Sequence, residues 1–133
     1  MSDLGIVGIH HIALATANFA RLLEFYTATL GLPVLGGFPA ERIVFLGAGT
    51  TAIELEERAA TRGASVGGWA HIALEVADID AAHAMLVARG VSFEGPPEGY
   101  PPEAPAMRLA FCTDPDGNVI ELIRPLGDRY PPL

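Results

Sequence analysis

Cysteine and positive charge are scarce in this sequence. It contains a single cysteine, Cys112, and only eight basic residues against sixteen acidic ones. One thiol cannot form an intramolecular disulfide, nor a thiolate cluster for structural zinc. The formal net charge of −8 would be repelled by a phosphate backbone and by an anionic membrane surface. Nucleic acid and membranes are therefore poor candidates as partners.

Long hydrophobic runs are also missing. No run approaches the roughly 18 consecutive apolar residues that a membrane-spanning helix needs. The first basic residue is Arg21, and His10 and His11 interrupt the apolar stretch before it, which is unlike a secretory signal. Half of the 133 residues are nevertheless hydrophobic and only 18% are charged, so the chain is expected to fold around a core. A cytoplasmic location is expected.

What the sequence does contain is an internal repeat. Residues 8–15 match residues 68–75 at an offset of 60 and share the word His-Ile-Ala-Leu. Farther on, the Ile-Glu-Leu of residues 53–55 recurs at residues 120–122. Chance rarely supplies a second shared word in register after a similar helix. The chain is therefore expected to hold two copies of one βαβββ module, which is an α+β fold.

Each copy predicts a strand, a helix and three further strands. Strands are expected at 7–15, 33–37, 41–47 and 51–56, and again at 69–76, 91–94, 107–113 and 118–123. Apolar residues at helical spacing predict helices that begin after the N-cap candidates Asn18 and Asp78 and end at Gly31 and Gly90. The predicted organisation is a first module at 1–56, a linker at 57–68, a second module at 69–125 and a tail at 126–133.

The segment 94–106 holds five prolines. Proline lacks the backbone N–H and fixes φ, so this segment cannot be a regular helix or a central strand. It is either a cover over a binding cleft or a rigid surface connection.

One ionisable residue stands opposite a pair of large aliphatic residues on the first and last strands of each copy. The aliphatic face must be buried against the helix, so the ionisable side chains are expected on the opposite, concave face of the sheet. A carboxylate there is costly to desolvate without a compensating positive charge. Two neutral imidazoles and two carboxylates balance a divalent cation and leave room for water or substrate. We therefore expect one metal site formed by His11, Glu54, His71 and Glu121.

Taken singly, a strand histidine or glutamate is more often structural or solvent-facing than a ligand. The recurrence of both residue types at equivalent positions in the two copies favours the metal site. His10 is expected to face the helix side or the strand edge, and His83 lies on a helix, so neither is favoured as a ligand. Three further residues are candidates either for contact with substrate or for ordinary packing or surface positions: Trp69, Tyr100 and Arg108.

These motifs resemble the vicinal oxygen chelate superfamily, which groups glyoxalase I, bleomycin-resistance proteins and extradiol dioxygenases. The likeness rests on the His-Ile-Ala-Leu strand, the helix end at 25–31, the strand at 52–55 and the Asp-Pro-Asp-Gly-Asn turn at 114–118. It implies two modules forming a curved mixed sheet around a metal-binding cleft, with the helices on the convex face. The four ligand positions of the family fall on His11, Glu54, His71 and Glu121.

The ligand set is most similar to that of glyoxalase I. This implies a lyase or isomerase that binds one divalent metal (Ni, Co, Zn, Mn or Mg) and a small vicinal-oxygen substrate. A proton would move through a metal-chelated enediolate, carried by Glu121 first and Glu54 second. A homodimer is also expected. Ala15 and Arg58 stand where glyoxalase I would have the Arg and Asn that hold glutathione, which argues against that substrate.

Two other functions stay open. An Fe(II) extradiol-type dioxygenase or a fosfomycin-type thiol transferase would use only His11, His71 and Glu121, and the additional Glu54 argues against it. A bleomycin-type drug-binding protein would need no catalytic metal, and the complete ligand set argues against it. Bound metal distinguishes a binding protein from an enzyme, and oxygen uptake with Fe(II) distinguishes a dioxygenase from an isomerase.

Overall fold

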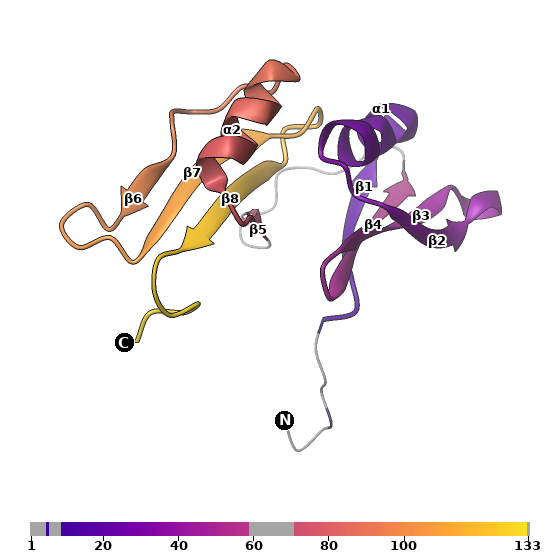
Figure 1. The fold of residues 1–133 in the computed structure, drawn as a ribbon. Helices are drawn as coiled ribbons and strands as arrows, with labels where there is room; N and C mark the ends of the chain where they lie inside the picture. Colours follow the sequence, from indigo (N-terminus) through magenta and orange to yellow (C-terminus); the bar gives the residue numbers. More distant parts are fainter. Residues whose placement is uncertain (1–4, 6–8, 59–70, 133) are drawn as a thin grey trace. The chain divides into compact units, whose positions relative to one another are not determined.

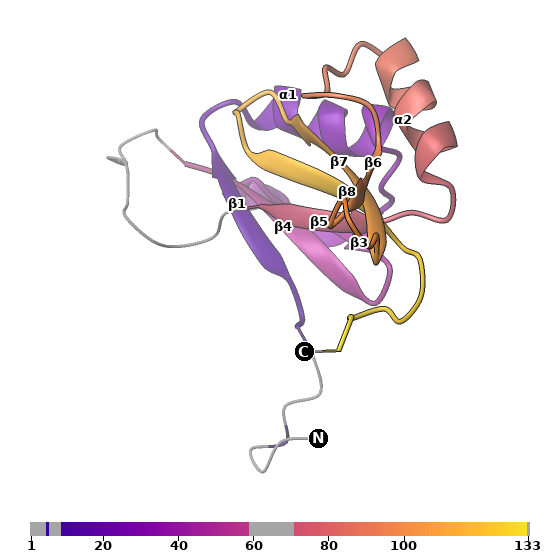
Figure 2. The same ribbon diagram turned by 90° about the vertical axis from the view of Figure 1, so that its left-hand side faces the viewer.

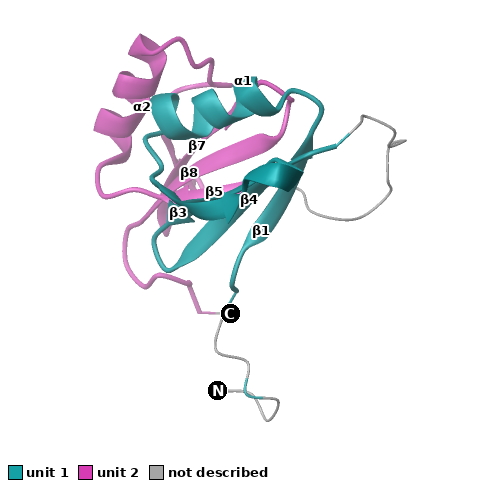
Figure 3. Ribbon diagram, turned by 90° about the vertical axis from the view of Figure 1, so that its right-hand side faces the viewer, with its two compact units in different colours: residues 1–63 teal, residues 64–133 magenta. Residues whose placement is uncertain are grey.

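The structure is a computed structural model in which residues 5, 9–58 and 71–132 are described. The chain divides into two compact units, Met1–Gly63 and Ala64–Leu133 (Figures 1 and 3). Each unit contains one helix-bearing, four-stranded mixed sheet, which confirms the predicted α+β fold of duplicated βαβββ modules. Residues 59–68 of the predicted linker lie outside the described residues. Among the residues that are described, no helix has the length and apolar character needed to cross a bilayer.

The sheet of the first unit has the strand order β1-β4-β3-β2. β1 runs parallel to β4, and the β4–β3 and β3–β2 pairs are antiparallel. The helix α1 lies over one face of this sheet (Figure 2). The elements in chain order are β1 (Ile12–Thr16), α1 (Phe19–Glu24), a wider helical turn (Phe25–Thr29), β2 (Val34–Phe38), a 3₁₀ turn (Pro39–Glu41), β3 (Ile43–Ala48) and β4 (Thr51–Glu57).

The helix-facing side of this sheet is aliphatic and forms the core of the unit. Ile53 and Leu55 of β4 alternate along the strand with Glu54, and both are almost fully buried. Leu22 and Tyr26 of the helix are completely buried as well. Since successive side chains of a strand point to opposite faces, Glu54 points away from this core. The alternation places an acid on the face that the helix does not cover.

The predicted helix after Asn18 changes its winding half-way. From Phe25 the backbone adopts a π-type turn, in which Leu30 N–H donates to the carbonyl of Phe25 at 2.9 Å. The hydroxyl of Thr27 donates to the carbonyl of Leu23 at 2.6 Å. A threonine that bonds the carbonyl four residues earlier competes with the regular backbone ladder, which explains the wider turn.

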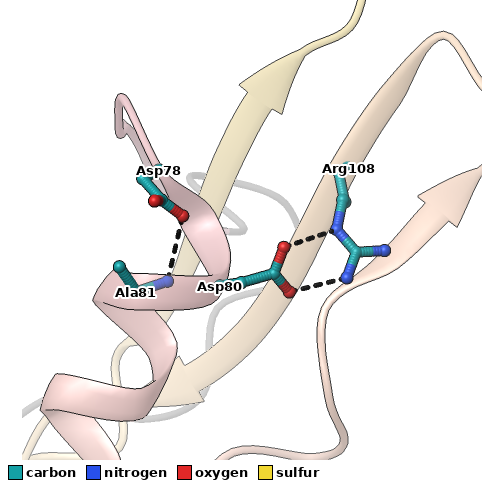
Figure 4. A network of polar contacts seen from close by, with 4 residues as sticks. All are labelled: Asp78, Asp80, Ala81 and Arg108. Atoms are coloured by element: carbon teal, nitrogen blue, oxygen red, sulfur yellow. Dashed lines mark hydrogen bonds and ion pairs between the residues drawn. The ribbon is translucent and has the colours of Figure 1, made fainter.

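The two predicted N-caps behave differently. The Asp78 carboxylate accepts a hydrogen bond from Ala81 N–H at 3.0 Å, as expected of a cap (Figure 4). Asn18 makes no side-chain cap, so that part of the prediction is wrong. Its backbone N–H instead donates to the hydroxyl of Thr16 at 2.9 Å, and Thr16 is buried. The buried threonine therefore fixes the strand-to-helix turn in the first unit.

The second unit repeats the topology with the order β5-β8-β7-β6. β5 is parallel to β8, and the other pairs are antiparallel. Ile120 and Leu122 of β8 are buried on the side that carries Leu86 of α2, in the same alternation as in the first unit. The elements are β5 (Ile72–Glu75), α2 (Ile79–Ala88), β6 (Glu98–Tyr100), β7 (Met107–Thr113) and β8 (Val119–Pro125).

One predicted strand of this unit is wrong. Residues 91–94 form no strand, and only an isolated bridge joins Phe93 to Cys112. Pro96 and Pro97 cannot donate backbone hydrogen bonds, so the ladder cannot continue through them. Pairing with β7 resumes at Glu98, inside the proline-rich segment 94–106. That segment therefore supplies the edge strand of the sheet, a position at which proline is tolerated.

Candidate metal centre

The first unit brings together two of the predicted ligands. His11 Nε2 lies 3.5 Å from Glu54 Oε2, and the Glu54 side chain is only 14% exposed. The prediction placed His11 inside a strand at 7–15, but β1 begins at Ile12 and residues 6–8 lie outside the described residues. His11 is thus the residue immediately before the strand. The hydroxyl of Thr51, the first residue of β4, donates to the carbonyl of Ile9 at 2.7 Å and holds this segment against β4.

The second unit brings together the other two. His71 Nε2 lies 3.0 Å from Glu121 Oε1, and the Glu121 side chain is 9% exposed. His71 also directly precedes its strand, since β5 begins at Ile72, and residues 69–70 lie outside the described residues. The same pair of residue types therefore recurs at the same place of each βαβββ module.

A phenylalanine completes each pair. Phe45 of β3 lies opposite Glu54 in the β3–β4 register, and its ring meets that of His11 edge to face at 5.4 Å. Phe111 of β7 lies opposite Glu121, and its ring meets that of His71 at 5.9 Å. The contact of these phenylalanines with the histidines was not predicted from the sequence. Strand register was the signal, because residues directly opposite one another share a face.

The spacing within each pair suits shared coordination of one cation. Nitrogen and oxygen ligands about 2.1 Å from a metal, at tetrahedral or octahedral angles, lie roughly 3.0–3.4 Å from each other. The observed separations are 3.5 Å and 3.0 Å. Among the ion pairs formed by the described residues, neither acid has an arginine partner. Within those residues no cluster of three or more metal-binding side chains is found. The two contacts bring together His11 with Glu54 and His71 with Glu121.

The other two histidines are placed differently. His83 of α2 packs against Phe93 with 4.4 Å between ring centroids. His10 was expected on the helix side or at the strand edge; its Nδ1 lies 2.9 Å from Nδ1 of His11, and its ring meets that of Phe45 at 6.3 Å, so it is on the side of the candidate ligands rather than the helix side. The strand alternation does not reach His10, because β1 begins two residues later.

Arg108 lies on the helix side of its sheet. It forms two hydrogen bonds with Asp80 of α2, at 2.6 Å and 3.3 Å (Figure 4). These bonds lower the pKa of Asp80 and raise that of Arg108. Phe111 is three residues farther along β7, so it points to the opposite face. Arg108 therefore ties the helix to the sheet. Tyr100 is an exposed residue of β6, and Trp69 lies outside the described residues.

A protein-family model matches residues 8–122, which is most of the chain, and it describes the glyoxalase/bleomycin resistance protein/dioxygenase superfamily. The chain belongs to this superfamily. The assignment confirms the resemblance seen in the sequence. The superfamily includes metal-dependent enzymes as well as binding proteins without catalysis. No match was found among curated protein sequences.

Several solved structures share the fold. A member from Sphaerobacter thermophilus is 29% identical, with a TM-score of 0.73 over 90% of this chain and 98% of the other. TnmS3, an antibiotic binding protein from Streptomyces sp. CB03234, is 28% identical, with a TM-score of 0.74 over 91% and 98%. Lactoylglutathione lyase from Agrobacterium tumefaciens is 18% identical, with a TM-score of 0.69 over 90% and 95%. The last similarity concerns the fold alone.

Proposed function

We propose that this superfamily member is a metal-dependent lyase or isomerase of glyoxalase type, acting on a small substrate with vicinal oxygen atoms. One divalent cation (Ni, Co, Zn, Mn or Mg) would be held by His11, Glu54, His71 and Glu121. The single observation that carries the proposal is the recurrence of a His–Glu pair at equivalent positions of both modules, at 3.5 Å and 3.0 Å.

The donor set fits such an ion. Two neutral imidazoles bring no charge and two carboxylates bring two negative charges, which balance a divalent cation. When bound, the ion would supply Lewis-acid polarisation of the substrate oxygens. Each acid is largely shielded from water, so two carboxylates without a neutralising charge would be costly at the proposed site. A cation removes that cost.

The carboxylates would also carry the proton. Glu121 takes a proton from one substrate carbon and returns it to the neighbouring carbon, so the reaction is a rearrangement that needs no oxidant or reductant. Glu121 is the first choice because it is the less exposed of the two acids. Glu54 is the second carrier. The substrate carbons must lie within hydrogen-bonding reach of the acid for this transfer.

We do not propose glutathione as part of the substrate. Ala15 has no polar side chain, and Arg58 is engaged with Glu56 at 2.6 Å. The residues that hold glutathione in glyoxalase I are thus replaced at both positions. A glutathione hemithioacetal is nevertheless the reference substrate to assay. No turnover with it, together with turnover of a smaller hydroxycarbonyl compound, would support a substrate without glutathione.

The proposal is tested by elemental analysis followed by activity assays with each metal restored. Purified protein is expected to carry about one divalent ion per site, and Glu121→Gln is expected to fold normally but to lose turnover by a factor of about 10² or more. Glu57→Gln is the matched control: Glu57 is on the same strand as Glu54 but pairs with Arg42 at 3.2 Å, and the variant should keep full activity. Retained turnover in Glu121→Gln, or a wild type that binds no divalent ion, would contradict the proposal.

A drug-binding function is the second candidate. It is supported by the 28% identity to TnmS3, whose name describes an antibiotic binding protein. Such a protein would bind its ligand equally well after metal removal by a chelator, whereas the proposed enzyme would not. Oxygen uptake with Fe(II) would instead favour an extradiol-type dioxygenase that uses His11, His71 and Glu121.

A homodimer is also proposed. Modules that each carry half of a ligand set can complete it within one chain or across the two chains of such a dimer. Light scattering should give about twice the 14.0 kDa of one chain. Refolding a mixture of the His11→Ala and His71→Ala proteins tests the arrangement. If the site is built across two chains, the mixed dimer contains one intact site and regains metal; if it is built within one chain, neither site is intact.

A further inference from the structure

His10 and His11 make a contact that has no counterpart in the second module. Their Nδ1 atoms lie 2.9 Å apart, a hydrogen-bond distance. Two imidazole nitrogens can bond only if one carries the proton and the other offers its lone pair. The second module has Ala70 at the position equivalent to His10, so His71 lacks such a partner from the preceding residue.

The direction of this hydrogen bond decides which nitrogen of His11 carries the proton and which one can bind a cation. His11 Nε2 is directed toward Glu54, and a nitrogen that binds a cation must offer its lone pair. The proton of a neutral His11 then resides on Nδ1, which donates to Nδ1 of His10. At 3.5 Å, a competing bond from a protonated Nε2 to Glu54 would be weak, so a neutral His11 loses little by keeping its proton on Nδ1, which lies 2.9 Å from Nδ1 of His10.

Packing keeps the two rings in this arrangement. Phe45 contacts both, with centroid separations of 5.4 Å to His11 and 6.3 Å to His10. The two imidazoles themselves meet at 82°. The Thr51 hydroxyl anchors the carbonyl of Ile9, the residue before His10. The orientation is thus supported from the strand β3 and from the start of β4.

We infer that His10 is a positioning residue that holds His11 in the Nδ1–H form, so that Nε2 presents its lone pair on the side of Glu54. The inference rests on the proposed function, because the lone pair of Nε2 is assigned from the ability of that nitrogen to bind a cation; the proton positions measured in the metal-free protein test it separately from metal binding. Groups that fix the far nitrogen of a ligating histidine typically change metal affinity by about 10–100-fold when removed.

The test compares two substitutions at one position. His10→Ala installs the residue of the second module, whereas His10→Asn keeps an acceptor oxygen close to the place of Nδ1. Long-range ¹H–¹⁵N spectra of the metal-free protein, at a pH where imidazoles are neutral, report which His11 nitrogen carries the proton. We expect Nδ1–H in the wild type and in His10→Asn, and a shift toward Nε2–H in His10→Ala.

Zinc affinity, measured by competition with a chromophoric chelator, gives the second readout. His10→Ala should bind Zn²⁺ about 10-fold more weakly, His10→Asn should recover most of the loss, and His83→Ala is the matched control that should leave affinity unchanged. An unaltered His11 proton position in His10→Ala would overturn the inference. So would a loss as complete as in His11→Ala without rescue by Asn, since His10 would then be a ligand itself. A wild type that binds no metal would refute the proposed function, while the spectra would still decide the role of His10.

Discussion

The surroundings of Cys112 change the acidity of its thiol. The residue is buried on β7, and burial, together with the negative charge of Asp114, raises the pKa of its thiol to about 11. A thiol in an unfolded chain titrates near 8.5. The native state therefore keeps the proton at pH values where the unfolded chain has lost it.

This difference predicts a stability that decreases in alkali. Between the two pKa values the native state binds more protons than the unfolded state, so stability falls as pH rises through that window. From about pH 8 to about pH 10, urea unfolding of the wild type should lose about 1–2 kcal/mol more than that of Cys112→Ala. The variant corrects for other alkaline groups. Parallel pH profiles of the two proteins would contradict the prediction.

The four candidate ligands show how much of a site the sequence can predict. The His–Glu pairs follow from the repeat and from strand alternation, and the structure brings each pair together. The contact between His10 and His11 does not follow, because it depends on β1 beginning at Ile12 rather than earlier. The roles of Phe45 and Phe111 required the strand register, which a single sequence does not provide.

Among the elements, the β7–β8 turn is organised by one buried acid. The Asp114 carboxylate accepts hydrogen bonds from the backbone N–H groups of Asp116 and Asn118, both at 2.9 Å, and from the Asn118 side chain at 2.7 Å. Gly117 adopts a positive φ of 85°, which favours glycine. The turn therefore fixes the register in which β8 presents Glu121.

Removing this carboxylate should destabilise the second unit. Asp114→Ala leaves donors without their charged acceptor and is expected to cost about 2–4 kcal/mol in urea unfolding. Asp116→Ala is the matched control, since Asp116 is exposed and contributes its backbone N–H rather than its side chain; its effect should stay within about 0.5 kcal/mol. Equal effects of the two substitutions would refute the role assigned to Asp114.

Two adjacent glycines of β2 offer a second matched pair. A Cβ at Gly37 would collide with the backbone carbonyl oxygen of Ile43 and come within 3.0 Å of Val44 Cα, whereas a Cβ at Gly36 meets nothing within 4 Å. Gly37→Ala should therefore lower the free energy of unfolding by about 1–3 kcal/mol. Gly36→Ala should be neutral or slightly stabilising. Comparable unfolding midpoints for both variants would show that the β2–β3 approach is not as close as described.

The elements also mark where sequence patterns stop being informative. Alternation and turn residues predict β3, β4, β7 and β8 within a few residues, because buried aliphatic residues and glycine turns dictate them. Residues 91–94 carry an apolar pattern, yet pairing is interrupted by Pro96 and Pro97 and resumes at Glu98. The π-type turn at Phe25–Thr29 depends on one hydroxyl bond from Thr27, which apolar spacing does not reveal.

For the whole molecule, charge connects stability with metal binding. The formal net charge is −8, and in the proposed site two shielded carboxylates, those of Glu54 and Glu121, would bind one cation. An ion that binds only the native state stabilises it by mass action. The folding of the two units and the loading of the site should therefore be linked.

Metal titration tests that linkage directly. At a free ion concentration about 100 times the Kd, the free energy of unfolding should rise by about 2.7 kcal/mol, and chelation should reverse the gain. The double variant Glu54→Gln, Glu121→Gln should show no gain, while Glu57→Gln should show all of it. Stabilisation that persists in the double variant would mean that the ion binds elsewhere.

The position of the single thiol gives the protein a built-in reporter. The chain has no lysine, so a thiol-reactive dye has one strongly preferred attachment point, Cys112, inside the second unit. Labelling then requires that unit to open, and the dye incorporation rate under native conditions measures its opening frequency. A single tag therefore follows the half of the duplicated fold in which Cys112 is buried.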